Sequence, residues 1–155
     1  MSTAKVKNPR KVFLWQIVFV KHPINPYLFQ SIDLPEVNIE QVAHGDINRE
    51  VKTGGRITTG NMTARKMETT SGSDTWIWDW LKSIQDDILG GGLTPSEYWE
   101  TIIVNELAED GVSILNSWTM NEVWPTRING KSLDRMSSDN TMDEIEFSIG
   151  TVVKI

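Results

Sequence analysis

The chain has 155 residues, 39% hydrophobic and 23% charged, a composition typical of one globular domain spanning residues 1–155. It has no cysteine and two separated histidines, which excludes a disulfide framework and thiol catalysis and predicts neither a metal nor any other cofactor. The formal net charge is −6, but residues 1–70 carry 10 Lys/Arg against 6 Asp/Glu, whereas residues 71–155 carry 5 against 15.

The N-terminal third begins with polar residues 1–10, which we expect to be flexible. Apolar side chains occupy both faces of residues 12–20, which predicts a strand covered on both sides, and alternation predicts further strands at 27–33 and 37–43. The basic start and apolar run imitate a signal peptide. However, nine residues cannot span a bilayer and no small-residue cleavage pattern follows, so we expect an untargeted protein with no membrane partner.

Residues 44–72 differ in character, because glycines punctuate a polar, Thr-rich and basic segment with almost no large apolar side chain. We interpret this segment as a long protruding β-hairpin with arms near 47–52 and 56–67 and a turn at 53–55. A hairpin without an apolar face cannot stabilise itself in water. We therefore expect it to rest on something outside its own domain.

One segment, residues 74–89, has a sustained helical period. Ser73 and Asp74 can cap its first turn, and the glycines at 90–92 can end it in the left-handed region. A helix of this length is marginal alone in water, so it must cover a sheet. The side chains predicted to form the helix–sheet core are Trp76, Ile77, Trp80, Leu81, Ile84 and Ile88.

The second half of the chain is predicted to be mostly strand. Residues 98–107 and 112–123 form a hairpin that turns at 109–111, Pro125 ends its second strand, and residues 141–153 form a half-buried closing strand. Together these patterns predict a mainly β fold with seven or eight strands. We expect a small antiparallel β-barrel or sandwich with one flanking α-helix and the long protruding β-hairpin.

No catalytic constellation is present in the sequence. The glycines at 90–92 end a helix where phosphate-binding loops begin one, and Asp86 and Asp87 lie on the solvent side of the predicted helix. The seven tryptophans could stack on nucleic-acid bases, but Trp76 and Trp80 belong to the apolar helix flank and the domain is acidic. We therefore expect no enzyme and favour a core role for these rings.

Several motifs follow one another in a recognisable order: the N-terminal aromatic strand, the segment 31–45 (SIDLPEVNIEQVAHG), the helix motif 74–80 (DTWIWDW), the turn 109–111, then Trp118 and Trp124-Pro125, and the strand 143–147 (DEIEF). In this order the chain resembles the tail tube proteins of contractile bacteriophages, a family similar to the inner tubes of other contractile injection systems. The resemblance runs from about residue 12 to the C-terminus.

The resemblance implies a structural protein of the virion that is assembled in the host bacterial cytoplasm. Six copies would form a ring, and rings would stack head to tail into a hollow tube that conducts the genome into the host. The implied partners are the tail sheath, baseplate and tail-terminator proteins, and DNA would pass through the lumen without specific binding. An inner tube of a type VI secretion or other contractile injection system is an alternative, as is a small β-barrel that binds a ligand or nucleic acid.

Charge suggests two surfaces of such a tube. The basic residues of the predicted hairpin segment would stack rings against the acidic second half of a neighbour. These ring-stacking candidates are Arg49, Lys52, Arg56, Arg65 and Lys66. Glu144 and Glu146 lie opposite the apolar face of the closing strand and are candidates for an acidic lumen that repels phosphates.

Overall fold

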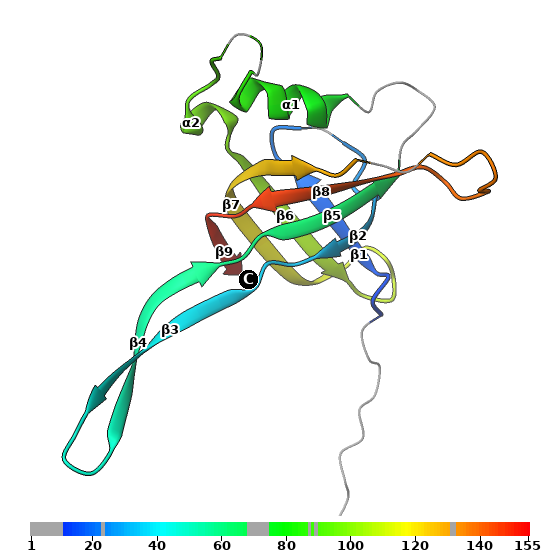
Figure 1. The fold of residues 1–155 in the computed structure, drawn as a ribbon. Helices are drawn as coiled ribbons and strands as arrows, with labels where there is room; N and C mark the ends of the chain where they lie inside the picture. Colours follow the sequence, from blue (N-terminus) through cyan, green and yellow to red (C-terminus); the bar gives the residue numbers. More distant parts are fainter. Residues whose placement is uncertain (1–10, 23, 68–74, 87, 89, 131–132) are drawn as a thin grey trace, which may run out of the picture.

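The computed structural model describes residues 11–22, 24–67, 75–86, 88, 90–130 and 133–155. Strands dominate this part of the chain, and the longer helix covers one end of the sheet (Figure 1). The elements are β1 (Trp15–Phe19), β2 (Phe29–Asp33), β3 (Val37–Gly45), β4 (Glu50–Thr59), β5 (Met62–Met67), α1 (Trp76–Ile84), α2 (Pro95–Tyr98), β6 (Glu100–Leu107), β7 (Ile114–Ile128), β8 (Met142–Ser148) and β9 (Thr151–Lys154). The predicted mainly β, antiparallel fold with a flanking helix and a protruding hairpin is confirmed.

β7 joins the two halves of a seven-stranded antiparallel sheet with the order β1-β6-β7-β8-β5-β2. Its first part pairs with β6 on one side and β9 on the other, and its second part pairs with β8. Glu122, where the pairing changes, has a φ of 58°, in the left-handed region. Among the described strands no ladder joins β1 to β2, so the sheet curls without closing into a barrel.

Pro125 does not end the strand as predicted, because β7 continues to Ile128. The register of the β7–β8 ladder shifts between Pro125 and Arg127. Proline is tolerated at such an irregularity because its missing N–H falls where the ladder is already interrupted.

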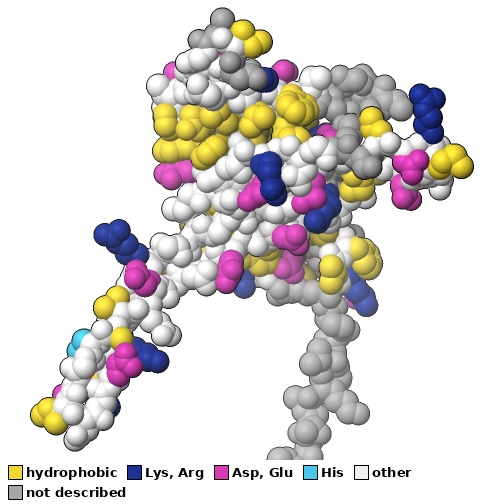
Figure 2. Space-filling model, viewed as in Figure 1, with side chains coloured by type: hydrophobic (Ala, Val, Ile, Leu, Met, Phe, Trp, Pro, Cys, Tyr) yellow, Lys and Arg dark blue, Asp and Glu magenta, His cyan; other side chains and the backbone are white. Residues whose placement is uncertain are grey.

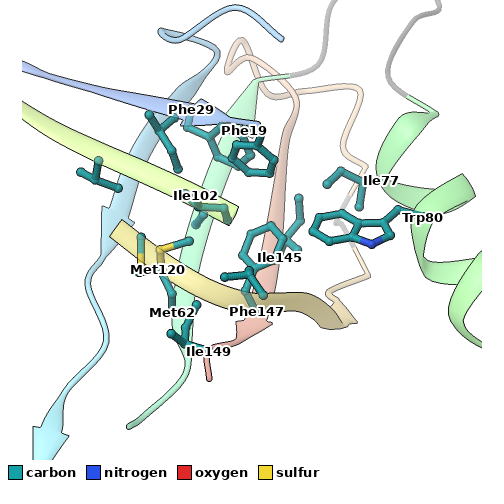
Figure 3. Close-up of a cluster of buried hydrophobic side chains, with 14 residues drawn as sticks. Phe19, Phe29, Met62, Ile77, Trp80, Ile102, Met120, Ile145, Phe147 and Ile149 are labelled. Atoms are coloured by element: carbon teal, nitrogen blue, oxygen red, sulfur yellow. The ribbon is translucent and has the colours of Figure 1, made fainter. Parts of the chain in front are cut away.

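The core lies between the two halves of the sheet and is closed at one end by α1 (Figure 3). Phe19 of β1 occupies its centre, since its ring stacks on Phe29 at 5.6 Å and lies edge-on to Phe147 at 6.0 Å and to Trp76 at 5.4 Å. Strands β5 and β8 alternate between buried and partly exposed side chains, as strands covered on one face should. The fourteen buried members are Ile17, Phe19, Phe29, Met62, Ala64, Ile77, Trp80, Ile102, Val104, Met120, Val123, Ile145, Phe147 and Ile149.

The helix is shorter than the predicted 74–89, because α1 ends at Ile84 and Gln85 is extended. The chain turns back at once, and the Leu93 N–H donates to the Ser83 carbonyl at 2.8 Å. Gly92 passes so close to the Ile84 carbonyl that no side chain would fit there. The glycines at 90–92 thus allow the chain to fold back against the end of α1. They do not cap a longer helix. The predicted caps Ser73 and Asp74 lie outside the described residues.

The hairpin occupies residues 37–59 and not the predicted 44–72. It turns at Asp46–Arg49, where the Asp46 N–H donates to the Arg49 carbonyl at 2.7 Å. The predicted turn at residues 53–55 lies inside β4, opposite a register shift between Ile39 and Gln41. A Cβ on Gly55 would crowd β3, so glycine there allows close packing of the two strands.

The predicted return arm was wrong from residue 62 onward, because Met62–Met67 is β5 of the body. Met62 and Ala64 point into the core. The predicted closing strand 141–153 is likewise divided, into β8 and β9, by a turn in which the Gly150 N–H donates to the Asn121 carbonyl at 3.0 Å.

Candidate assembly surfaces

The hairpin β3–β4 extends away from the body as a two-stranded arm (Figures 1 and 2). Nine to ten residues per strand, at about 3.3 Å each, give an arm roughly 30 Å long. The predicted arm at 44–72 had almost no large apolar side chain, whereas the observed arm at 37–59 exposes five. They are Val37, Ile39, Val42, Ile47 and Ile57. Since an isolated two-stranded ribbon is marginal in water, an arm with exposed aliphatic side chains suits contact with another molecule.

The charge of the arm differs from the prediction. Residues 37–59 carry Arg49, Lys52 and Arg56 against Glu40, Asp46 and Glu50, so the arm is formally neutral. The predicted basic character depended on Arg65 and Lys66, which lie on β5 of the body, and left out Glu40 of β3. A basic stacking arm is therefore wrong as a description of this hairpin.

The other two stacking candidates lie on β5. Lys66 points inward with a fully buried side chain, and its Nζ is 3.1 Å from Oδ2 of Asp143 on the neighbouring strand. A buried amine in an ion pair cannot contact a neighbouring subunit, so Lys66 is removed from the stacking set. Arg65 faces outward and is already engaged, since its guanidinium lies 3.7 Å from Glu144 and 3.9 Å from Asp33.

The two lumen candidates lie on the outer face of the sheet half formed by β2, β5, β8 and β7. Glu146 Oε2 is 2.9 Å from the Arg127 guanidinium, and its Oε1 accepts from the Asn61 amide at 2.8 Å. Glu144 faces Arg65. Positive and negative side chains thus alternate over this face (Figure 2), and the acidic groups are largely compensated.

The six residues predicted to form the helix–sheet core differ in how deeply they are buried. Ile77 and Trp80 are buried, and Trp76 and Ile84 are partly buried against the core. Leu81 is half-buried. Ile88 is 87% exposed, because α1 ends one turn before it, and it does not belong to the core.

A buried acid that the sequence gave no reason to single out joins β1, β6 and α1. Glu100 is 1% exposed, and its carboxylate accepts from the backbone N–H groups of Lys21 and Thr101 and lies 2.6 Å from Nδ1 of His22. Burial alone would raise the pKa of Glu100, but these hydrogen bonds outweigh it and lower the pKa below 4.5. The ring centroids of His22 and Trp80 are 4.7 Å apart, so the cluster anchors α1 to the sheet.

Two absences hold for the described part of the chain. Within it, no group of three or more His, Cys, Asp or Glu side chains could hold a metal ion. No described helix is long and apolar enough to cross a membrane.

Comparison with known proteins gives one family and a shared fold. Residues 13–152 match the family described as T4-like virus tail tube protein gp19. No curated protein sequence matches the chain significantly.

Solved structures with a similar fold include chains of contractile assemblies. The anti-feeding prophage tube-terminating cap has a TM-score of 0.80 at 17% identity, covering 99% of this chain and 95% of that one. A chain of the PVC sheath–tube complex, from an extracellular contractile injection system, has a TM-score of 0.77 at 21% identity, covering 99% of both chains. Hcp1 from Flavobacterium johnsoniae has a TM-score of 0.51 at 12% identity, covering 92% and 94%.

Proposed function

The chain belongs to the T4-like virus tail tube protein gp19 family, and we propose that it is the repeating subunit of a hollow tail tube. Six copies form a ring, rings stack head to tail, and the lumen conducts the genome into the host without binding DNA specifically. The subunit has a structural and not a catalytic role, is assembled in the bacterial cytoplasm and becomes part of the virion.

The observation that carries this proposal is the exposed apolar arm. Its aliphatic side chains are exposed to water and are not covered by the subunit's own body. Burying them against a neighbouring subunit would therefore stabilise the assembly. An arm that docks on a different surface of the next copy makes a heterologous contact. Heterologous contacts generate closed rings when the rotation between copies closes, and open filaments when it does not. A tube of stacked rings uses both kinds of contact, one within each ring and one between rings.

The proposed partners are sheath, baseplate and tail-terminator proteins. Chains of the same fold have been solved in a sheath–tube complex and in a tube-terminating cap, which supports the first and the last of these.

The sheet face that bears Glu144 and Glu146 is our candidate for the lumen wall. Its paired charges would repel DNA weakly while offering no basic patch that could trap it.

The second candidate function is the inner tube of a contractile injection or type VI secretion system. The likeness in fold to a chain of the PVC sheath–tube complex, from an extracellular contractile injection system, supports this alternative. The gene neighbourhood separates the two candidates: capsid and portal genes indicate a phage tail, and effector or secretion-membrane genes indicate an injection system. A small ligand-binding barrel is not favoured, because Trp76 and Trp80 pack against the core.

Negative-stain electron microscopy of the purified chain tests the proposal. Stacked rings or tubes with a stain-filled centre are expected. Particles that remain single subunits at high protein concentration, in low and in moderate salt, would contradict it.

A further inference from the structure

The chain leaves β7 through Asn129 and Gly130, directly after the last residue of the strand. The Asn129 N–H donates to the Glu144 carbonyl at 2.9 Å, which ties the backbone of Asn129 to β8. Gly130 lies beyond this bond and is exposed, and among the described residues its own N–H has no carbonyl partner. A Cβ added at Gly130 would meet no described heavy atom within 4 Å. The peptide bond between the two residues therefore lies where the sheet releases the chain into open space.

An asparagine followed by glycine carries its own nucleophile and electrophile. The backbone nitrogen of Gly130, after losing its proton to water or hydroxide, can attack Cγ of the Asn129 side chain. A C–N bond forms and closes a succinimide ring, the bond between Cγ and Nδ2 breaks, and Nδ2 leaves as ammonia. Water then opens the ring at one of its two carbonyls, which yields aspartate or isoaspartate. The net reaction consumes one water, releases one ammonia and needs no cofactor.

The local structure favours this reaction at Asn129 over the other asparagines. Attack requires the nitrogen to approach Cγ to about 3–3.5 Å, and glycine has no Cβ to obstruct the approach. Of the ten asparagines, Asn129 alone precedes a glycine. Asn140 is exposed in the same connection between β7 and β8, but it precedes the β-branched Thr141. Asn116 lies inside the β6–β7 ladder, where strand pairing fixes its backbone in an extended form.

We propose that Asn129 is a self-modifying site, which converts to aspartate and isoaspartate in the folded subunit. Both products add one negative charge where β7 leaves β8, close to the Glu144 backbone. Isoaspartate also lengthens the main chain by one atom at this point, because its backbone runs through Cγ. The modification is a property of the subunit itself and does not depend on the proposed tube function.

The purified full chain is incubated at about pH 8 and about 37 °C, sampled over days and digested with pepsin at acidic pH, where succinimide formation is slow. Mass spectrometry measures the gain of about 1 Da at each asparagine. An isoaspartyl methyltransferase with a labelled methyl donor detects isoaspartate. Gly130→Ala is the matched variant, since the added Cβ has room, and Asn140 is the internal control. Gly130→Ser replaces Gly130→Ala if circular dichroism shows that the first variant has not folded.

Asn129 is expected to convert about tenfold faster than Asn140 or more, and Gly130→Ala should slow Asn129 by a similar factor, because an added side chain hinders the attack. The products should contain both aspartate and isoaspartate. Equal rates at Asn129 and Asn140, an unchanged rate in Gly130→Ala, or aspartate without isoaspartate would overturn the proposal. Retention of Asn129 in the folded chain, while a synthetic peptide of residues 125–135 converts under the same conditions, would overturn it as well, since the fold would then protect the site.

Discussion

Glu100 shows how a single residue couples three elements. A buried carboxylate is unfavourable unless it is hydrogen-bonded, and this one takes backbone donors from Lys21 and Thr101 and the ring of His22. Charge-assisted hydrogen bonds of this kind contribute about 1.5–3 kcal/mol each. The sequence could not predict the cluster, because residues 21–22 and residue 100 are 78–79 positions apart and meet only beyond the end of the β1–β6 ladder.

The cluster predicts how stability depends on pH. The folded pKa of Glu100 is lowered, so its stabilisation is fully present above its ordinary value of 4.5 and is lost as pH falls through the folded value. Glu100→Gln should lose about 1–3 kcal/mol of unfolding free energy at pH 7 and should be less sensitive to acid below pH about 4.5 than the parent chain. Denaturant unfolding from pH 3 to 7 measures both effects. Parallel pH profiles for the two proteins would contradict the role assigned to Glu100.

Two neighbouring glycines give a matched test of the return after α1. A Cβ at position 92 would meet the Ile84 carbonyl, whereas a Cβ at position 91 would lie in open space. Gly92→Ala should therefore cost about 1–3 kcal/mol, and Gly91→Ala should change stability by less than about 0.5 kcal/mol. Thermal unfolding compares them. Similar melting temperatures for the two variants would show that the chain does not pass close to Ile84.

At the scale of elements, the position of α1 could be predicted from its period, but its length and exact face could not. The predicted core included Ile77 and Trp80, which the structure buries, but also Leu81, which is half-buried, and Ile88, which is exposed. Local periodicity describes an ideal continuous helix. It contains no information on the chain reversal after Ile84, which ends α1 there.

Helix–sheet packing is tested by placing an aspartate at a buried and at a half-buried position of α1. Ile77→Asp places a carboxylate in the core and should cost several kcal/mol and yield insoluble protein, whereas Leu81→Asp should be milder because Leu81 is half-buried. Soluble expression and thermal unfolding report the difference. A soluble Ile77→Asp variant with an unchanged melting temperature would show that this face of α1 is not the packed one.

Strand assignments failed where local signals were ambiguous. Ile102, Ile103 and Val104 are three consecutive apolar residues, so alternation could not show which face is buried; the structure buries Ile102 and Val104. The glycine pair at 54–55 resembled a turn, although Asp46–Arg49 makes it. Both errors arise because pairing partners distant in sequence decide register and turn position.

The hairpin predicts a variant that separates folding from assembly. Ile47→Asp alters a side chain at the exposed tip, so the monomer should keep its circular dichroism spectrum and melting temperature while sedimenting as a small species. Met136→Asp, at an equally exposed position, is the control and should assemble normally. Raised salt screens the added charge but does not replace the lost apolar contact, so it should not restore assembly of Ile47→Asp. Full assembly of that variant would exclude the arm tip from subunit contacts.

At the scale of the whole molecule, fold class and family could be predicted from the order of weak motifs, whereas the open seam could not. Seven or eight strands suited a closed barrel as well as a sandwich. Only the three-dimensional pairing shows that β1 and β2 are left unjoined and that β7 is shared between the sheet halves. The groove beside β1 and β2 and the exposed aliphatic arm belong to this level, since neither exists until distant segments come together.

The most direct test of the tube proposal is a cryo-electron microscopy map of the purified chain after assembly. The expected map contains six-fold rings stacked in one direction around an open lumen, with each hairpin lying against a neighbouring subunit. A monomer, or a closed assembly whose subunits meet through one self-complementary patch with the hairpins free, would contradict the account.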